Sequence, residues 1–507
     1  MTLISRILGF FRDMIVARLL GAGTGADAFF VAFKIPNFLR RLFAEGAFSQ
    51  AFVPVLSEYK SKRDLAETQQ FVNDLAGTLG GVLIGVTLLG VIAAPIFVLI
   101  FAPGFWGHAT KFDLTVEMLR ITFPYLFFIS LTAFAGGILN TYGKFGVPAF
   151  TPIFLNLALI FSATVMAPYF DEPAVALAWG VFIAGVLQLA FQVPFLKQLR
   201  FLPRPRWAWR SEAVQRVIKL MLPVIFGSSV VQVNLLLDTL IASFLVTGSV
   251  SWLYYSDRLV EFPLGVFGIA LATVVLPNLS KKHAEAATDG FGRMIDWALR
   301  LVLLIATPAT LGLIILSGPM LVTLFQYGAF SEHDVRMARL SLMTFSMGLP
   351  AFILIKILAN GFYARQDTKT PVRIGIYAVI ANMVSNAVLV IPMQYFDIPG
   401  GHAALAFSTS MAAFLNCGML YHLLRKQGVY TPQPGWSKLM AQIALASIAM
   451  VAALWWSGSD LTVWFAMSGY ERVWRLCALI GIGGGVYMAA LLLLGVRFRH
   501  FRTAFKS

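Results

Sequence analysis

The sequence predicts an all-α polytopic membrane protein with fourteen transmembrane helices. Of its 507 residues, 58% are hydrophobic and only 12% are charged, about half the charged share of a soluble domain. Mean hydropathy is +0.78, and a soluble protein of this length could not cover its surface with so few charges. Apolar runs of about 20 residues, the length of a membrane-crossing helix, recur from end to end. They lack the two-residue alternation of a transmembrane β-barrel, so that class is excluded.

The apolar runs define the expected spans. They lie at 2–19, 27–54, 72–101, 116–139, 148–168, 174–195, 217–246, 250–277, 298–325, 338–362, 372–394, 402–424, 439–457 and 473–495. Charged residues such as Arg12 and Lys34 interrupt the first two spans. These two cross the membrane only if those residues face protein or water rather than lipid.

Basic residues between the spans predict the orientation. Loops after even-numbered spans, together with the C-terminal tail, hold 23 Lys and Arg, whereas loops after odd-numbered spans hold about three. Short loops rich in Lys and Arg stay in the cytoplasm, so both termini are expected there. The same placement accounts for the net charge of +15 without nucleic acid as a partner.

An internal repeat predicts the architecture. Similar landmarks recur at an offset of 223–224 residues: Pro54 with Pro277, Pro95 with Pro319, Phe101 with Phe325, and Pro148 with Pro371. Two parallel copies of a six-helix unit around a midplane cavity are typical of transporters. We expect an N-lobe at 1–200, a basic cytoplasmic linker at 201–215, a C-lobe at 216–426, and two extra helices with a basic tail at 427–507.

Charged residues inside the spans are the first candidates for a binding site, because each costs at least ~2.5–3.5 kcal/mol in hydrocarbon. They are Arg6, Arg12, Asp13, Arg18, Asp27, Lys34, Arg40, Arg41, Glu45, Asp257, Arg258 and Glu261. Basic residues outnumber acidic ones, and converging arginines bind phosphate through bidentate bonds. A water-filled cavity lined this way is expected to accept a polyanionic headgroup. The alternative is that these charges snorkel to the interfaces or form structural ion pairs.

A second polar set predicts a site for a monovalent cation such as Na⁺. Its members are Asn234 and Asp238 in span seven, Asn382 and Asn386 in span eleven, and Ser408 or Thr409 in span twelve. The i,i+4 spacing places each pair on one helical face. The alternative is an interhelical hydrogen-bond cluster that holds the C-lobe together.

The lack of catalytic and metal-binding motifs indicates a transporter rather than an enzyme. We find no Walker A sequence, HExxH motif or His/Cys metal cluster, so no catalytic residues, metal site or cofactor are expected. Transport must then draw on an ion gradient, the membrane potential or substrate flux.

The loop FLPRPRWAWR mixes Arg with Trp, which suits contact with anionic membrane lipids. Glycines near Gly483 in the last span indicate either close helix packing or a groove for a lipid chain.

Four segments resemble the MurJ (MviN) lipid II flippases of bacteria. They are SRILGFFRDMIVARLLGAGTGADAFFVAFKIPNFLRRLFAEGAFSQAFVPVLSEYKSK, GSVSWLYYSDRLVEFPLGVFGIALATVVLPNLSK, GFYARQDTKTPV and YTPQPGW. The family belongs to the same superfamily as the MATE drug exporters. The resemblance implies two six-helix lobes plus two extra helices. It also implies a multi-pass protein of the bacterial cytoplasmic (inner) membrane that moves undecaprenyl-diphosphate-linked lipid II to the outer leaflet for peptidoglycan synthesis.

The resemblance also implies roles for particular residues. The family's functional arginines and aspartate match Arg6, Arg12, Arg40, Arg258 and Asp27, and we expect Asp13, Lys34, Arg41, Asp257 and Glu261 to lie near the same cavity. A sodium site of some members maps onto Asp238, Asn382 and Asn386, to which we add Thr409. A groove formed by helices 13 and 14 is implied to hold the polyprenyl tail.

The expected mechanism is alternating access by rocking of the two lobes, with lipid II bound through its diphosphate in a cationic cavity. One alternative is a flippase for another polyprenyl-diphosphate-linked oligosaccharide. The other is a MATE-like antiporter of small molecules or ions, which would need a net acidic cavity to bind cations. The sequence gives no indication of contact with the cell-wall synthesis machinery.

Overall fold

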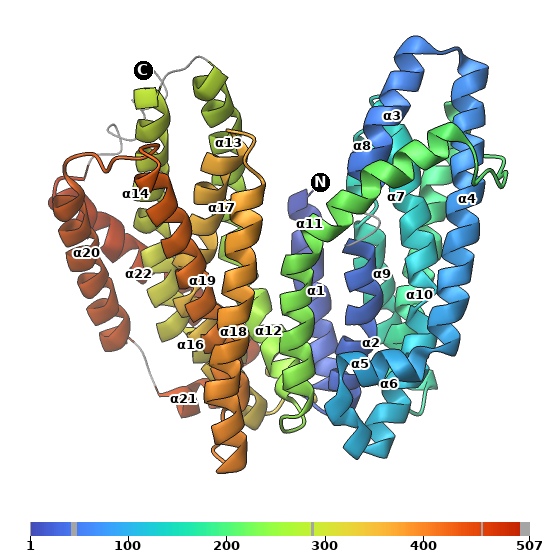
Figure 1. Cartoon of the computed structure of the whole chain (residues 1–507). Coiled ribbons are helices and arrows are strands. Elements are labelled where there is room, and N and C mark those ends of the chain that lie inside the picture. Colours follow the sequence, from blue (N-terminus) through green and yellow to red (C-terminus); the bar gives the residue numbers. More distant parts are fainter. Residues whose placement is uncertain (1, 42–47, 285–287, 458–459, 497–507) are drawn as a thin grey trace. The chain divides into compact units, whose positions relative to one another are not determined.

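The structure is a computed structural model that describes residues 2–41, 48–284, 288–457 and 460–496. All regular secondary structure in these ranges is helical (Figure 1). By length and composition, eleven helical segments in the described part can cross a membrane. They coincide with the expected spans three to six and eight to fourteen. The prediction of an all-helical, multi-pass membrane protein is confirmed, while the total of fourteen spans stays a prediction.

The chain forms two compact units, of which the first comprises Met1–Ser251 and Tyr327–Phe330. Its helices are α1 (Thr2–Leu20), α2 (Thr24–Arg40), α3 (Ser49–Lys62), α4 (Leu65–Ile92), α5 (Ala94–Phe101), α6 (Ala109–Thr122), α7 (Tyr125–Thr141), α8 (Gly146–Phe150), α9 (Ile153–Phe161), α10 (Pro173–Gln198) and α11 (Glu212–Ser243). Short 3₁₀ and π segments at 103–107 and 162–169 join some of them. α1 and α2 carry the charges that interrupt the expected first two spans.

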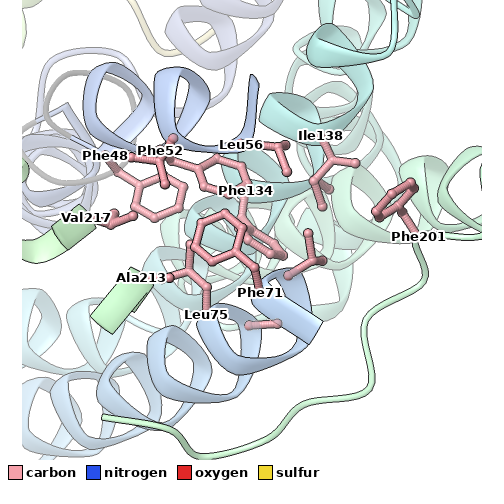
Figure 2. Close-up of a cluster of buried hydrophobic side chains, with 14 of the residues drawn as sticks. Phe48, Phe52, Leu56, Phe71, Leu75, Phe134, Ile138, Phe201, Ala213 and Val217 are labelled. Atoms are coloured by element: carbon pink, nitrogen blue, oxygen red, sulfur yellow. The ribbon is translucent and has the colours of Figure 1, made fainter. Parts of the chain in front are cut away.

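Aromatic side chains fill one core of this unit (Figure 2). Phe52 of α3 lies with its ring centroid 5.0 Å from that of Phe134 in α7, and Phe71 of α4 lies 6.0 Å from Phe52. A Cβ on Gly137 of α7 would come within 2.9 Å of the Phe52 ring. Glycine at this position therefore lets α3 and α7 pack closely. Phe201, just after α10, is buried in the same core.

The second unit comprises Trp252–Gln326 and Ser331–Ser507. Its helices are the greater part of α12 (Ser249–Pro263), α13 (Ile269–Ala284), α14 (Thr288–Ile315), α15 (Ser317–Phe325), α16 (Glu332–Met347), α17 (Leu349–Tyr363), α18 (Lys369–Tyr395), α19 (Gly401–Lys426), α20 (Trp436–Ser457), α21 (Leu461–Ala466) and α22 (Gly469–Leu493). A π segment at 264–268 follows α12. Within this unit α18 packs against α19, and α20 packs against both α14 and α22.

The internal repeat is visible in the helix boundaries. Helices that begin at Leu65, Ala94 and Ala109 have counterparts that begin 223 positions later, at Thr288, Ser317 and Glu332. In both copies a long helix breaks just before a short helix that carries a proline in its first turn, Pro95 in α5 and Pro319 in α15. The secondary structure thus repeats as the sequence does. The division at 200 and the parallel arrangement of two six-helix lobes stay predictions.

Candidate functional site

Arg12 and Asp13 form a buried polar cluster on α1. The Arg12 guanidinium donates to Asp13 Oδ1 through Nη2 at 2.6 Å and through Nε at 3.0 Å. Its Nη1 donates to Asn156 Oδ1 of α9 at 3.0 Å, and Asn156 Nδ2 donates to the Ser5 carbonyl at 2.9 Å. A buried charge is tolerated only when it is paired and hydrogen-bonded, and both conditions hold here. The cluster links α1 to α9 and fixes the direction of the Arg12 fork.

Arg6 lies in a different environment from Arg12. α1 is continuous through Gly9, which lies between the two arginines. Six positions along an ideal helix are not a whole number of turns, and Arg6 is exposed whereas Arg12 is buried. Arg18, near the end of α1, is exposed as well. The structure therefore does not place the α1 arginines in one cluster.

Asp27 in the first turn of α2 is the centre of a second buried network. Its Oδ2 accepts from Lys111 Nζ of α6 at 2.7 Å and from the Gly248 amide at 2.8 Å. Its Oδ1 accepts from the amide and the hydroxyl of Ser251 at 2.9 and 2.6 Å. The side chains of Asp27 and Lys111 are 1% and 5% exposed. Because both carboxylate oxygens are engaged, Asp27 ties α2 to α6 and to the start of α12, where Gly248 precedes the helix and Ser251 lies in its first turn.

The remaining candidates on α2 lie toward its C-terminal end. Arg40 Nε donates to Asn37 Oδ1 at 2.8 Å, one turn earlier in the helix. Lys34 and Arg40 are partly exposed, and Arg41 is exposed. Glu45 lies outside the described residues.

In the second unit, α12 carries Arg258 with local partners. Arg258 Nη1 donates to Glu261 Oε2 at 2.8 Å, and its Nη2 donates to Tyr254 Oη at 3.1 Å. The guanidinium also lies over the Tyr254 ring, 5.0 Å from its centroid. Arg258 is 32% exposed and Asp257 is exposed. These contacts hold the guanidinium in one orientation while part of it stays open to a ligand.

The cation-site candidates fall into two groups, one in each unit. On α11 of the first unit, Asn234 Nδ2 donates to Asp238 Oδ2 at 3.4 Å. In the second unit Asn382 and Asn386 of α18 are buried, and Thr409 Oγ1 of α19 donates to the Leu405 carbonyl at 3.1 Å. α18 and α19 are joined by a 2.9 Å bond between the hydroxyls of Ser385 and Ser408. The described residues hold no group of three or more His, Cys, Asp or Glu that could bind a metal ion.

Sequence reasoning missed three residues of these clusters. Lys111 is one of the few basic residues between the end of an odd-numbered expected span and the next span, where a loop is predicted, although it is buried in α6. Asn156 and Tyr254 are not among the candidates that the sequence predicts. Tyr254 could have been found from its i,i+4 spacing to Arg258. The contacts of Lys111 and Asn156 join residues 84 and 144 positions apart, and no local pattern indicates them.

Comparison with known proteins identifies the family of this chain. Residues 16–474 match the family model described as "Lipid II flippase MurJ". The "Probable lipid II flippase MurJ" of Haemophilus influenzae is 49% identical and covers 99% of this chain and 100% of its own length. The "Lipid II flippase MurJ" of Burkholderia cenocepacia is 42% identical, with 100% and 98% covered.

Two solved structures show the same fold. A structure titled "Lipid II flippase MurJ, inward closed conformation" aligns over 98% of both chains with 26% identity and a TM-score of 0.81. An inward-facing multidrug resistance MATE family transporter of the MOP superfamily has 15% identity and a TM-score of 0.63, with 84% of this chain and 95% of its own covered. The second likeness is one of fold alone.

Proposed function

Because the chain belongs to the lipid II flippase MurJ family, we propose that it moves lipid II from the inner to the outer leaflet of the bacterial cytoplasmic membrane. The observation that carries the proposal is the 49% identity to a probable lipid II flippase over the full length of both chains. Lipid II joins a polyprenyl tail to a diphosphate and a sugar-peptide head. A transporter for it needs cationic groups for the diphosphate and an apolar surface for the tail.

We assign the diphosphate to the matched arginines, Arg6, Arg12, Arg40 and Arg258. Guanidinium groups offer two parallel N–H donors to a phosphate, and the bond is charge-assisted. The hydrogen bond of Arg258 to Tyr254 supports the assignment, because a fixed guanidinium loses less freedom on binding. Arg12 can bind the diphosphate only in a state where Asp13, which accepts from its Nε and Nη2 in the described state, has released it. Enclosing these arginines removes their water, which is favourable only when phosphate replaces it.

We propose alternating access as the mechanism for this large amphipathic substrate. The head crosses inside the protein while the tail stays in lipid, so the cavity opens to one side of the membrane at a time. Asp27 can contribute to headgroup binding only in a state where Lys111 and Ser251 have released its carboxylate. In the described state that carboxylate is fully engaged.

The driving force is proposed to be the membrane potential, with a monovalent cation as a second contributor. The inside-negative potential favours return of an empty cationic cavity to the cytoplasmic side, on a scale of ~2.3 kcal/mol per charge per 100 mV. Asp238, Asn382, Asn386 and Thr409 are the proposed oxygen ligands for Na⁺. Asp238 supplies the single negative charge that such a site needs.

The polyprenyl tail is assigned to the surface of α20 and α22. A Cβ on Gly483 would meet Leu454 of α20 at 3.1 Å, so this glycine serves helix packing. For Gly481, Gly484 and Gly485, no described atom lies within 4 Å of an added Cβ. The three open glycines leave a shallow, apolar surface on which an acyl chain can lie.

The test is lipid II exposure in cells depleted of their own flippase. Lipid II on the outer leaflet is measured after expression of this chain or of an empty vector. We expect the chain to restore exposed lipid II and growth. Growth failure together with accumulation of lipid II on the inner leaflet would contradict the substrate assignment, provided the protein is present in the membrane at the level of the native flippase.

A further inference from the structure

The linker between α10 and α11 is held along α4 by hydrogen bonds from end to end. The bonds run from Gln69 Nε2 to the Arg200 carbonyl at 2.7 Å, from the Arg204 amide to Asn73 Oδ1 at 2.7 Å, from the Arg206 amide to the Asn73 carbonyl at 3.1 Å, and from the Ala208 amide to Thr78 Oγ1 at 3.2 Å. A Cβ on Gly77 would come within 2.3 Å of the Arg206 backbone, and one on Gly81 within 2.5 Å of the Trp207 ring. Glycine at both positions lets the linker lie against α4.

The sequence of α4 shows at which depth the linker lies. α4 is polar up to Asp74 and carries no charge from Leu75 to Ile92. These 18 residues span about 27 Å at 1.5 Å per residue, close to the hydrocarbon thickness of a bilayer. The boundary between Asp74 and Leu75 therefore marks the headgroup level. The bonds to Asn73 and Thr78 fix the linker across this boundary.

Two hollows open along the linker. The first, of about 420 Å³, is lined by Lys197, Arg200 and Arg204 together with Gln69 and Asn73. Its described lining includes no acidic side chain. Arg206 is directed elsewhere, with Nε 3.9 Å from Asp74 Oδ1. The first hollow thus presents three cations and two neutral polar groups at headgroup level.

The second hollow, of about 650 Å³, is lined by Trp207, Ala208, Trp209 and Arg210. Trp207 and Trp209 are 63% and 44% exposed, and their rings stack with centroids 6.3 Å apart. Tryptophan is enriched at the membrane interface because its ring is apolar and its N–H is polar. Exposed indoles at this depth suit lipid better than water.

We propose that this linker is a binding site for the headgroup of an anionic phospholipid, with Lys197, Arg200 and Arg204 on the phosphate and the indoles of Trp207 and Trp209 against the first part of the acyl chains. The bound lipid is a resident of the membrane and is not transported. The positive charge of the linker selects an anionic lipid over a zwitterionic one. The site extends the proposed function without depending on it.

The first test counts lipids retained on the purified full-length protein by native mass spectrometry, with phosphatidylglycerol and phosphatidylcholine offered in equal amounts. The variant K197Q/R200Q/R204Q removes the three charges, and K369Q/R373Q/K426Q removes three exposed charges from the second unit as a matched control. We expect wild type and control to prefer phosphatidylglycerol, and the linker variant to bind it about tenfold less. Equal binding by both variants would overturn the proposal.

The second test separates a lipid from other anions. The difference in Trp emission between wild type and W207F/W209F, in liposomes, reports the linker indoles alone. We expect brominated phosphatidylglycerol to quench this difference and inorganic phosphate to leave lipid retention unchanged. Displacement of the lipid by phosphate would indicate a site for free phosphate, and an unquenched difference would indicate a water-facing surface for an acidic protein segment. Either result would contradict a lipid site.

Discussion

Asp27 and Lys111 illustrate what single residues contribute. Each is buried, and each compensates the charge of the other. Removing one partner of a buried pair leaves the other charge without compensation and costs about 3–5 kcal/mol. Replacing both charged residues by uncharged residues of similar shape can leave the free energy of unfolding nearly unchanged.

We therefore expect Asp27→Asn to lower the melting temperature of the detergent-solubilised protein. Asn keeps the shape of Asp but cannot balance the Lys111 charge. The double variant Asp27→Asn with Lys111→Met should recover much of the loss. Thermal melts of the three proteins in one detergent provide the measurement. Equal melting temperatures for wild type and Asp27→Asn would show that the pair does not stabilise the fold.

Between elements, Glu58 of α3 and Arg216 of α11 form a link at the protein surface. Arg216 Nη2 donates to Glu58 Oε2 at 2.7 Å. The hydrogen bond from Arg216 lowers the pKa of Glu58 below its usual 4.5, and a second bond from Lys62 acts in the same direction. A carboxyl group whose pKa is lowered by folding stabilises the fold above its usual pKa and loses this contribution as pH falls through the folded pKa.

Glu58→Gln should accordingly lower thermal stability slightly at neutral pH, and the difference from wild type should shrink below pH 4.5. The effect is small because the pair is largely exposed. Thermal melts of wild type and Glu58→Gln across this pH range test this prediction. Glu332→Gln, which removes a second exposed ion pair, is measured alongside. A difference that grows as pH falls would contradict the assigned sign.

The glycines of α22 allow a matched pair of substitutions. Gly483→Val places methyl groups against Leu454 and should cost about 1–3 kcal/mol by overpacking. A Cβ added at Gly484 meets no described atom within 4 Å, so Gly484→Val should leave the melting temperature unchanged. If Gly484→Val nevertheless reduces lipid II exposure in cells, the proposed tail surface gains direct support. Equal destabilisation by both variants would show that the two faces of α22 do not differ as described.

For the whole molecule, the features that follow from local patterns could be predicted. The apolar runs of the expected spans three to six and eight to fourteen, and the repeat offset, appear in the sequence as runs and periods. The helix breaks near Pro95 and Pro319 are not predicted, because the expected spans 72–101 and 298–325 run through both prolines. The resemblance to the MurJ family is confirmed by the family match, and with it the expectation of a transporter rather than an enzyme. The fold class is confirmed in its all-helical, multi-pass form.

The partners of the charged residues could not be predicted, because they come from distant parts of the chain. The sequence leaves open whether Arg12 and Asp27 bind a substrate or form structural ion pairs, and it does not identify Asn156 and Lys111, which bind them in the described state. A charged residue in an apolar span can therefore bind a substrate or form a structural ion pair, and only the fold shows which bonds it makes. Arg258 differs, because two of its partners, Tyr254 and Glu261, lie within about one turn of it on α12.

The central claim is that guanidinium groups bind the diphosphate of lipid II, and Arg258 tests it most directly. Outer-leaflet lipid II should be compared in flippase-depleted cells that express wild type, Arg258→Ala, Arg258→Lys or Arg336→Ala. Arg336 is the matched control, because it too pairs with a carboxylate on its own helix, at 3.6 Å, and lies near an aromatic ring. We expect wild type and Arg336→Ala to expose lipid II, Arg258→Ala to fail, and Arg258→Lys to restore only part, since Lys lacks the bidentate fork. Normal export by Arg258→Ala, at normal protein level, would contradict the account.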